Sequence, residues 1–277
     1  MKIKFLGTSA GWPLPRLGCH CQLCSSKDPR DTRTRTQILI DDQILLDAGP
    51  ETYQHLNSLD SIASLQNDKK GETQNDRSIN ISHKLKAVLI SHAHPDHILG
   101  LWDLPHIYGR TENNIEKIRL YVTPPVLNGI RQIFSVPFQP IKPVVIKPNQ
   151  PFKIDNTKVE YFPVIHGKTP AFGIKLKSNK IFIYITDFNR ILPSQEIMVK
   201  HADYWAIDGS SLGKIGQGPG HISIQDGIQL AKKYKIKNTY FIHIGHKTGT
   251  HKFLEDYLQQ NAGPNFHIAF DGLELKL

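Results

Sequence analysis

The stretch of this sequence with the greatest capacity for chemistry is SHAHPDH, where His92, His94, Asp96 and His97 lie almost side by side. It directly follows the apolar run KAVLI, so the pattern predicts a loop at the end of a strand. Loops in this position commonly carry functional groups. Because neutral imidazoles and a carboxylate so close together can direct their lone pairs at shared cations, the stretch predicts a metal site.

Further histidines and aspartates follow other strand-like runs along the chain. His166 comes after EYFPVI, Asp187 after IFIYIT, and His243 lies within TYFIHI. Taken singly, each of them would more often be a core or edge residue satisfied by hydrogen bonds. Together they would lie near the carboxyl ends of sheet strands, where α/β folds commonly assemble their sites. We therefore expect them to join the metal site.

All three cysteines of the chain lie within LGCHCQLC, at Cys19, Cys21 and Cys24. A disulfide would use two of the thiols and leave one over. Structural zinc, in contrast, accepts three thiolates and one imidazole in a closed tetrahedron. The motif therefore predicts a second metal site, and His20, inside the motif, is one candidate for its fourth ligand, although its place between two ligands makes simultaneous coordination awkward.

The elements that must position these residues are mostly strands. β-type runs occupy residues 2–7, 36–40, 43–49, 86–91, 118–123, 158–165, 172–177, 181–187, 204–208, 239–244, 267–270 and 273–277. Asp41 and Asp42 predict a hairpin turn between two of the runs. One helix is predicted after a capping-box-like start at Ser223 and Asp226. Strands outnumber helices, which favours an α/β layered fold with two sheets or one strongly bent sheet.

Composition sets wider bounds. The 277 residues favour a single domain over residues 1–277, and the polar residues 65–82 predict a mobile insertion. No run of 18 apolar residues is present, which argues against a membrane span. The N-terminal apolar run is too short for a signal peptide, and clustered thiols without one favour the cytoplasm. The net charge of +9 admits an anionic substrate such as a phosphate ester or nucleic acid.

The motifs resemble those of the metallo-β-lactamase fold hydrolases over nearly the whole chain. The resemblance rests on LLDAG with Asp47, on SHAHPDH, and on the later His166, Asp187 and His243. It implies a four-layer αββα sandwich with a two-metal site. The implied ligands are His92, His94 and His166 for one ion, Asp96, His97 and His243 for the other, and Asp187 as the bridge. Asp47 is then either the family's buried aspartate that supports the metal loop or simply a turn residue before Gly49.

A narrower resemblance comes from FIHIGH and GPGHISI. The first is similar to the H-x-x-H ending of the phosphodiesterase that accompanies the phosphonate carbon–phosphorus lyase pathway. In that subfamily the cysteine motif joins the second histidine in a structural zinc site, which implies His246 here as the partner of Cys19, Cys21 and Cys24. His221, in GPGHISI, matches a histidine that would contact phosphate. With Asp96, it makes up the expected catalytic residues.

The function that the resemblance implies is a metal-dependent phosphodiesterase. Two divalent ions of zinc, manganese or iron would supply a hydroxide for hydrolysis of a small phosphodiester, such as a cyclic sugar phosphate. One alternative is a tRNA 3′-processing endonuclease, since GTSAGWP recurs there in varied form, but residues 51–85 lack a Gly/Lys-rich arm and the cysteine cluster argues against it. A second alternative is a protein like that of pyrroloquinoline quinone biosynthesis, which shares the cysteine motif. The expected binding partner is a small phosphate ester. A nucleic acid is the less favoured substrate, and no membrane contact is expected. The chain could also form a homodimer.

Overall fold

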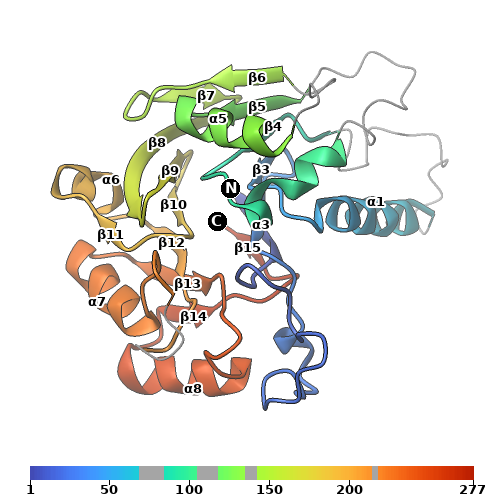
Figure 1. Cartoon of the computed structure of the whole chain (residues 1–277), viewed down its shortest axis with the longest axis vertical. Coiled ribbons are helices and arrows are strands. Elements are labelled where there is room, and N and C mark those ends of the chain that lie inside the picture. The colour runs from blue at the N-terminus through green and yellow to red at the C-terminus, as the bar shows by residue number, and fades with distance from the viewer. Residues whose placement is uncertain (69–83, 105–117, 135–141, 214–217) are drawn as a thin grey trace.

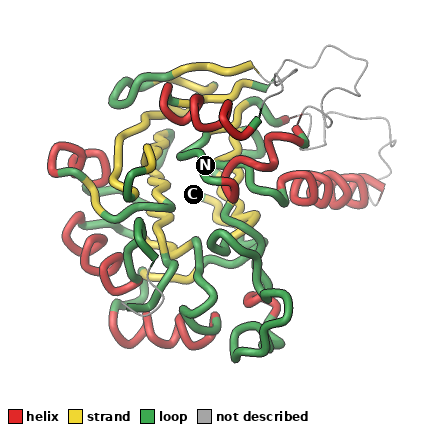
Figure 2. The backbone as a smooth tube through the Cα atoms, in the orientation of Figure 1, coloured by secondary structure: helices red, strands yellow, loops and turns green. Residues whose placement is uncertain are grey.

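Two β-sheets stacked against each other form the centre of the molecule, and helices lie outside them (Figures 1 and 2). The structure is a computed structural model that describes residues 1–68, 84–104, 118–134, 142–213 and 218–277. The segment expected to be a mobile insertion, 65–82, lies outside these residues from position 69 onward, and its first residues continue a helix.

The first sheet has the strand order β15-β1-β2-β3-β4-β5-β6. Its members are β1 (Lys2–Gly7), β2 (Gln37–Ile40), β3 (Ile44–Leu46), β4 (Ala87–Leu89), β5 (Arg119–Val122), β6 (Lys142–Val145) and β15 (Glu274–Lys276). Strands β3 to β6 run parallel to one another. Their carboxyl ends therefore meet at one edge of the sheet.

The second sheet has the order β11-β8-β9-β10-β12-β13-β14, with β7 paired to β8. Its members are β7 (Phe152–Ile154), β8 (Thr157–His166), β9 (Thr169–Lys177), β10 (Ile181–Ile185), β11 (Arg190–Ile191), β12 (Tyr204–Asp208), β13 (Asn238–Ile242) and β14 (Phe266–Ile268). Strands β10, β12, β13 and β14 are parallel. Residues that follow these strands consequently share one edge.

The helices cover the outer faces of the two sheets (Figure 1). They are α1 (Thr52–Asp68), α3 (Pro95–Ile98), α5 (Pro124–Ile133), α6 (Glu196–Val199), α7 (Ile224–Tyr234) and α8 (His251–Asn261), with short 3₁₀ turns at Pro29–Asp31, Leu99–Trp102 and Pro193–Gln195. Helices α1 and α5 share their apolar cluster with the first sheet, and α7 and α8 share theirs with the second. The layer order is thus the αββα sandwich expected from the sequence.

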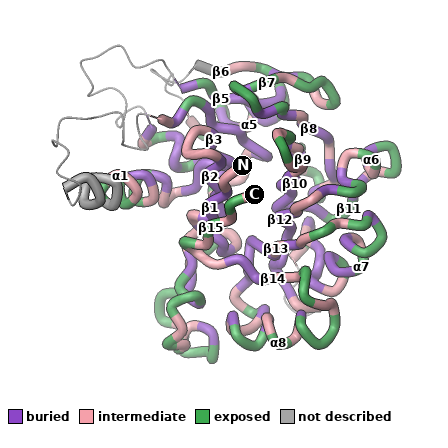
Figure 3. Tube along the Cα trace, turned by 180° about the vertical axis from the view of Figure 1, so that it is seen from behind, coloured by how far each residue is buried: buried purple, intermediate pink, exposed green. Residues whose placement is uncertain are grey.

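Side chains of strand β10 point alternately to its two faces, and both faces pack against apolar layers. Phe182 and Tyr184 are fully buried and belong to the core between the sheets. Ile183 and Ile185 point to the opposite face, where they join the apolar cluster under α7 and α8. Because side chains alternate along a strand, one run of apolar residues serves both contacts. The central strands are accordingly buried along most of their length (Figure 3).

Most of the predicted elements are present. Each strand-like run contains a strand, and α7 begins at Ser223 with a full capping box to Asp226. Asp41 and Asp42 both have positive φ, as a tight hairpin turn between β2 and β3 requires. Helices α1, α5 and α8 were not predicted. In the described part of the chain, no helix combines the length and apolar character needed to cross a membrane.

Candidate metal centres

The histidines and aspartates of interest come together where strands of both sheets end. The loop after β4 carries His92 and His94, and the short helix α3 carries Asp96 and His97. His166 ends β8, while Asp187 and His243 follow the parallel strands β10 and β13. Residues separated by up to about 150 positions are therefore gathered by strand ends.

A first cluster combines three histidines with one carboxylate. Ligand atoms of His92, His94, His166 and Asp187 all lie within 4.8 Å of one another. His166 Nε2 is 3.2 Å from His94 Nδ1. Asp187 Oδ2 is 3.7 Å from His92 Nε2 and 3.9 Å from His166 Nε2.

A second cluster lies on the other side of the same carboxylate. It consists of Asp96, His97, Asp187 and His243, again within 4.8 Å. Asp187 Oδ1 is 3.4 Å from both His97 Nε2 and His243 Nε2. Asp187 therefore turns one oxygen to each cluster, which is the arrangement of a carboxylate between two cations.

The spacing and the unpaired nitrogens both fit metal ions. Ligands at 2.0–2.1 Å in a tetrahedral zinc site lie about 3.3 Å apart, and the pairs above are separated by 3.2 to 3.9 Å. Among the described residues, the buried Nε2 atoms of His92, His97 and His243 have no hydrogen-bond partner. Buried polar atoms are normally paired, so these nitrogens fit the lone-pair donors of a metal site.

Asp47 lies beneath the loop of residues 91–97 that carries His92, His94, Asp96 and His97, and binds it by hydrogen bonds. Its carboxylate is fully buried and accepts hydrogen bonds from the Ser91 backbone N–H, the Ser91 hydroxyl, Tyr184 and His97 Nδ1, at 2.7 to 2.8 Å. The bond from Nδ1 leaves His97 Nε2 facing Asp187. Asp47 could have been a simple turn residue or a buried support for the loop that carries the metal ligands. The structure favours the second interpretation, since such partners orient metal-ligating histidines.

Other ligands are oriented in the same way. His166 Nδ1 donates to the Gly220 carbonyl at 2.7 Å, which leaves its Nε2 for the first cluster. A Cβ at position 220 would lie 2.5 Å from that ring, and φ there is +103°, so the contact requires glycine. His243 itself has a φ of 56°, an uncommon conformation that clusters at functional sites in folded proteins.

The electrostatics of the clusters favour bound cations. Burial, and next the neighbouring His97, lower the pKa of His92 well below its usual range, which keeps its imidazole neutral. Burial opposes charge on His97 as well, but Asp96, Asp187 and Asp47 outweigh it and raise the pKa of His97 well above the usual range. The same negative charges that stabilise a proton on His97 would attract a divalent ion in its place.

His221 faces the clusters from the loop before α7. Its Nε2 lies 3.8 Å from Asp187 Oδ2, and its Nδ1 donates to Asp208 Oδ2 at 2.7 Å. Burial would lower the pKa of His221, but the hydrogen bond to Asp208 and the negative charges of Asp208 and Asp187 together outweigh it and raise the pKa to about 9. Asp208, fully buried at the end of β12, was missed by the sequence analysis.

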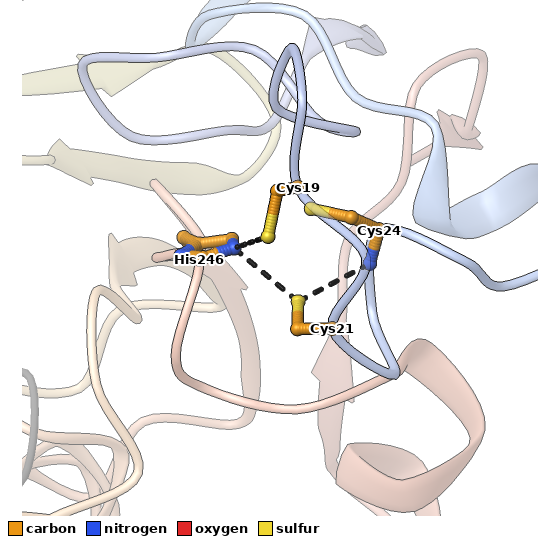
Figure 4. A group of neighbouring side chains, drawn as sticks. All are labelled: Cys19, Cys21, Cys24 and His246. Atoms are coloured by element: carbon orange, nitrogen blue, oxygen red, sulfur yellow. Dashed lines mark hydrogen bonds between the residues drawn. The ribbon is translucent and has the colours of Figure 1, made fainter.

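The cysteines form a separate cluster with His246 (Figure 4). His246 Nε2 lies 3.1 Å from Cys19 Sγ and 3.3 Å from Cys21 Sγ. Backbone N–H groups of Arg16 and Cys24 donate to cysteine sulfurs, as they would to thiolates. His20 belongs to none of the ligand clusters in the described chain. Four converging ligands suit a closed structural site that joins the N-terminal loop to the segment after β13.

A pocket of about 300 Å³ lies between the two kinds of site. His221 and His243 line it on the side of the histidine–aspartate clusters. His246 lines it on the side of the cysteines, together with Arg16 and Lys247. The pocket thus gives access to His221 and to His243 of the second cluster.

Comparison with protein families places these features in context. Residues 42–244 match the family described as "Beta-lactamase superfamily domain". An octanoyltransferase of Porphyromonas gingivalis is 28% identical over 286 residues, which cover 99% of this chain. They cover only 51% of that protein, so the chain spans about half the length of this relative.

Solved structures share the fold over essentially the whole chain. A diphosphatase of the PhnP family is 25% identical, with a TM-score of 0.77 and coverage of 100% of this chain and 97% of the other. Zinc-bound PqqB from Methylobacterium extorquens is 21% identical, with a TM-score of 0.78 and complete coverage of both chains. The short form of human tRNase Z is 16% identical, with a TM-score of 0.64 and coverage of 100% and 99%. At these identities the last two show the fold alone.

Proposed function

This chain belongs to the beta-lactamase superfamily, and we propose that within it the protein is a metal-dependent phosphodiesterase. The observation that carries the proposal is the position of Asp187, which directs Oδ2 to His92 and His166 and Oδ1 to His97 and His243. Two ions held by these side chains, with His94 and Asp96, would supply a nucleophile at neutral pH and neutralise charge on an attacked phosphate.

Other side chains would orient the histidines and supply a proton. Asp47 fixes the His97 ring through Nδ1, so that Nε2 keeps its direction toward Asp187. Asp208 does the same for His221, whose Nε2 then faces the pocket side of the clusters. A proton on this Nε2 is placed to pass to the leaving oxygen of a bound phosphodiester, which is the role of a general acid.

The substrate we propose is a small phosphodiester, with a cyclic sugar phosphate as the leading candidate. The size of the pocket and the likeness to a PhnP-family diphosphatase support this choice. Zinc, manganese and iron all suit imidazole and carboxylate ligands, and zinc suits the three cysteines with His246. The cytoplasmic location that the clustered cysteines favour is part of this proposal.

Hydrolysis of bis(p-nitrophenyl) phosphate, measured together with elemental analysis, tests the proposal. We expect turnover by the metal-loaded protein and a loss of at least roughly 10³-fold in Asp187→Asn, because several kcal/mol of charge stabilisation depend on the ions. Asp155→Asn is the matched control, since Asp155 is paired with Lys86 in an exposed turn. A metal-loaded protein that hydrolyses no phosphodiester would refute the function, and Asp187→Asn with full activity would refute the site.

A further inference from the structure

Two polar side chains, Gln37 on β2 and His55 on α1, form a hydrogen-bonded pair beside Asp47. The Gln37 side chain is buried, and its amide nitrogen donates to the Asp47 carbonyl at 3.0 Å and to the Thr52 hydroxyl at 2.8 Å. Its amide oxygen accepts a hydrogen bond from His55 Nδ1 at 2.6 Å. Both N–H groups and the oxygen of this amide are therefore engaged.

The chemistry of the partners fixes the orientation of this pair. A backbone carbonyl can only accept, so the nitrogen of the Gln37 amide must face Asp47 and its oxygen must face His55. Burial lowers the pKa of His55 to about 4, so the ring is neutral and carries its one proton on Nδ1. Nε2 lies 2.9 Å from the Thr34 hydroxyl. His55 thereby holds the Gln37 amide in the one orientation that reaches the Asp47 carbonyl.

Asp47 needs such a partner because its backbone is strained. Its φ of 58° lies in the left-handed region, which a residue with a Cβ seldom occupies and keeps only when its surroundings fix it. Its N–H donates to the Leu89 carbonyl at 2.9 Å, and its carbonyl accepts from Gln37. Its carboxylate accepts from His97 Nδ1. The hydrogen bond from Gln37 therefore holds a conformation on which the direction of this carboxylate depends.

The turn that the pair holds, residues 47–52, packs directly on the second cluster. A Cβ on Gly49 would lie 2.5 Å from the Asp96 carbonyl oxygen, so the two main chains touch with no room for a side chain between them. The Ala48 N–H also donates to the His97 carbonyl at 2.8 Å. Asp96 and His97 both belong to the second cluster. A shift of the turn would therefore move two of its ligands.

The first cluster depends less on this turn. His94 Nε2 lies 3.1 Å from the hydroxyl of Thr169 on β9, and His166 Nδ1 donates to the carbonyl of Gly220 in the loop before α7. Two of the three histidines of that cluster are thus oriented by residues of the second sheet and its loops. A change at the turn should act mainly on the second cluster.

We propose that Gln37 and His55 are positioning residues for the second metal site and act on it through Asp47 and the turn 47–52. The inference rests on the proposed function only in that the histidine–aspartate clusters bind ions. Neither side chain belongs to a ligand cluster in the described chain. Their effect on the site passes through the main chain of the turn and through the carboxylate that orients His97.

Two substitutions of His55 test the pair. His55→Leu removes the donor to Gln37, and we expect the affinity of the second cluster for Co²⁺ to fall by about 10-fold, as when hydrogen-bond partners behind metal ligands are lost. His55→Asn keeps an N–H donor near the position of Nδ1 and should return the affinity close to the wild-type value. The occupancy of each cluster can be read from anomalous diffraction of crystals equilibrated with graded Co²⁺ concentrations, a readout that does not depend on turnover.

A matched control separates positioning from a general loss of stability. Tyr234→Phe removes the hydrogen bond of a buried side chain to Glu196, in the apolar cluster under α7 and α8, and should leave Co²⁺ binding unchanged. Unaltered affinity in His55→Leu, equal weakening of both clusters, or no recovery in His55→Asn would overturn the positioning role while leaving the phosphodiesterase in place. A wild type whose histidine–aspartate clusters take up no ion would instead remove the proposed function itself.

Discussion

The pair formed by His221 and Asp208 gives a prediction that can be worked through quantitatively. If His221 protonates the leaving oxygen, His221→Ala should slow hydrolysis by roughly 10²–10⁴-fold. Asp208 donates nothing to the substrate in this account; it holds the imidazole through the 2.7 Å hydrogen bond. Loss of such a charged partner typically costs about 10- to 100-fold, which is the expectation for Asp208→Asn.

The two changes should not be additive. Once His221 is removed, Asp208 has no ring to orient, so the double variant should be about as slow as His221→Ala alone. This corresponds to a coupling energy of roughly 1.4–2.7 kcal/mol in a double-mutant cycle. Rates that fall by the product of the two single effects would contradict the reasoning. They would point to an effect of Asp208 through another neighbour, such as His243, whose Nδ1 lies 3.8 Å from Asp208 Oδ1.

Substrates with different leaving groups can show whether His221 acts as a general acid or only binds the phosphate. A p-nitrophenolate leaves with little need of a proton, whereas the alkoxide of a 2′,3′-cyclic nucleotide needs one. Initial rates on both substrates should therefore show the large loss in His221→Ala only for the cyclic nucleotide. Equal losses on the two substrates would show that His221 binds the phosphate and does not protonate the leaving oxygen.

The other predictions concern the metal centres. Cys21→Ser should reduce bound zinc and lower the melting temperature by about 5–10 °C, because a structural zinc contributes folding energy; unchanged melting would count against the closed site. Asp47→Asn should weaken metal binding at the histidine–aspartate clusters by roughly 10- to 100-fold in competition titrations, and unaltered affinity would remove Asp47 from its supporting role. A chelator should abolish hydrolysis, and a divalent ion should restore it; activity that persists in metal-free protein would contradict the mechanism.

The strands and α7 could be predicted because their signals are local. Apolar runs mark most of the strands, and Ser223 with Asp226 marks the start of α7. The short strands β6, β7 and β11 lie outside the predicted runs. Helix α5 was missed because Pro124 and Pro125 suggest a break, although proline is well tolerated in the first turn of a helix. Helix α1 carries many polar residues and a weak apolar stripe, so packing of Leu56 against the first sheet stabilises it more than its own pattern does.

Some residues of the candidate site could likewise be predicted from local sequence signals, and others could not. The ligand residues stand out because histidines and aspartates follow strands, and the resemblance supplied their grouping. Asp208 is the last residue of β12, near the strand end that Asp187 follows on β10, but it belongs to no recognisable motif. Only the parallel neighbours β10, β12 and β13 bring it beside His221 and His243, and strand order depends on contacts between distant segments. Gln37 and His55 were equally hidden, since nothing in the sequence shows that they form a hydrogen-bonded pair beside Asp47.

Anomalous diffraction from crystals of the purified protein would test the central claim most directly. We predict one peak on each side of the Asp187 carboxylate, and a separate zinc peak among the cysteines and His246. Diffraction that shows the side chains in place but no anomalous peak beside Asp187, in protein grown and crystallised with divalent metals, would contradict the account.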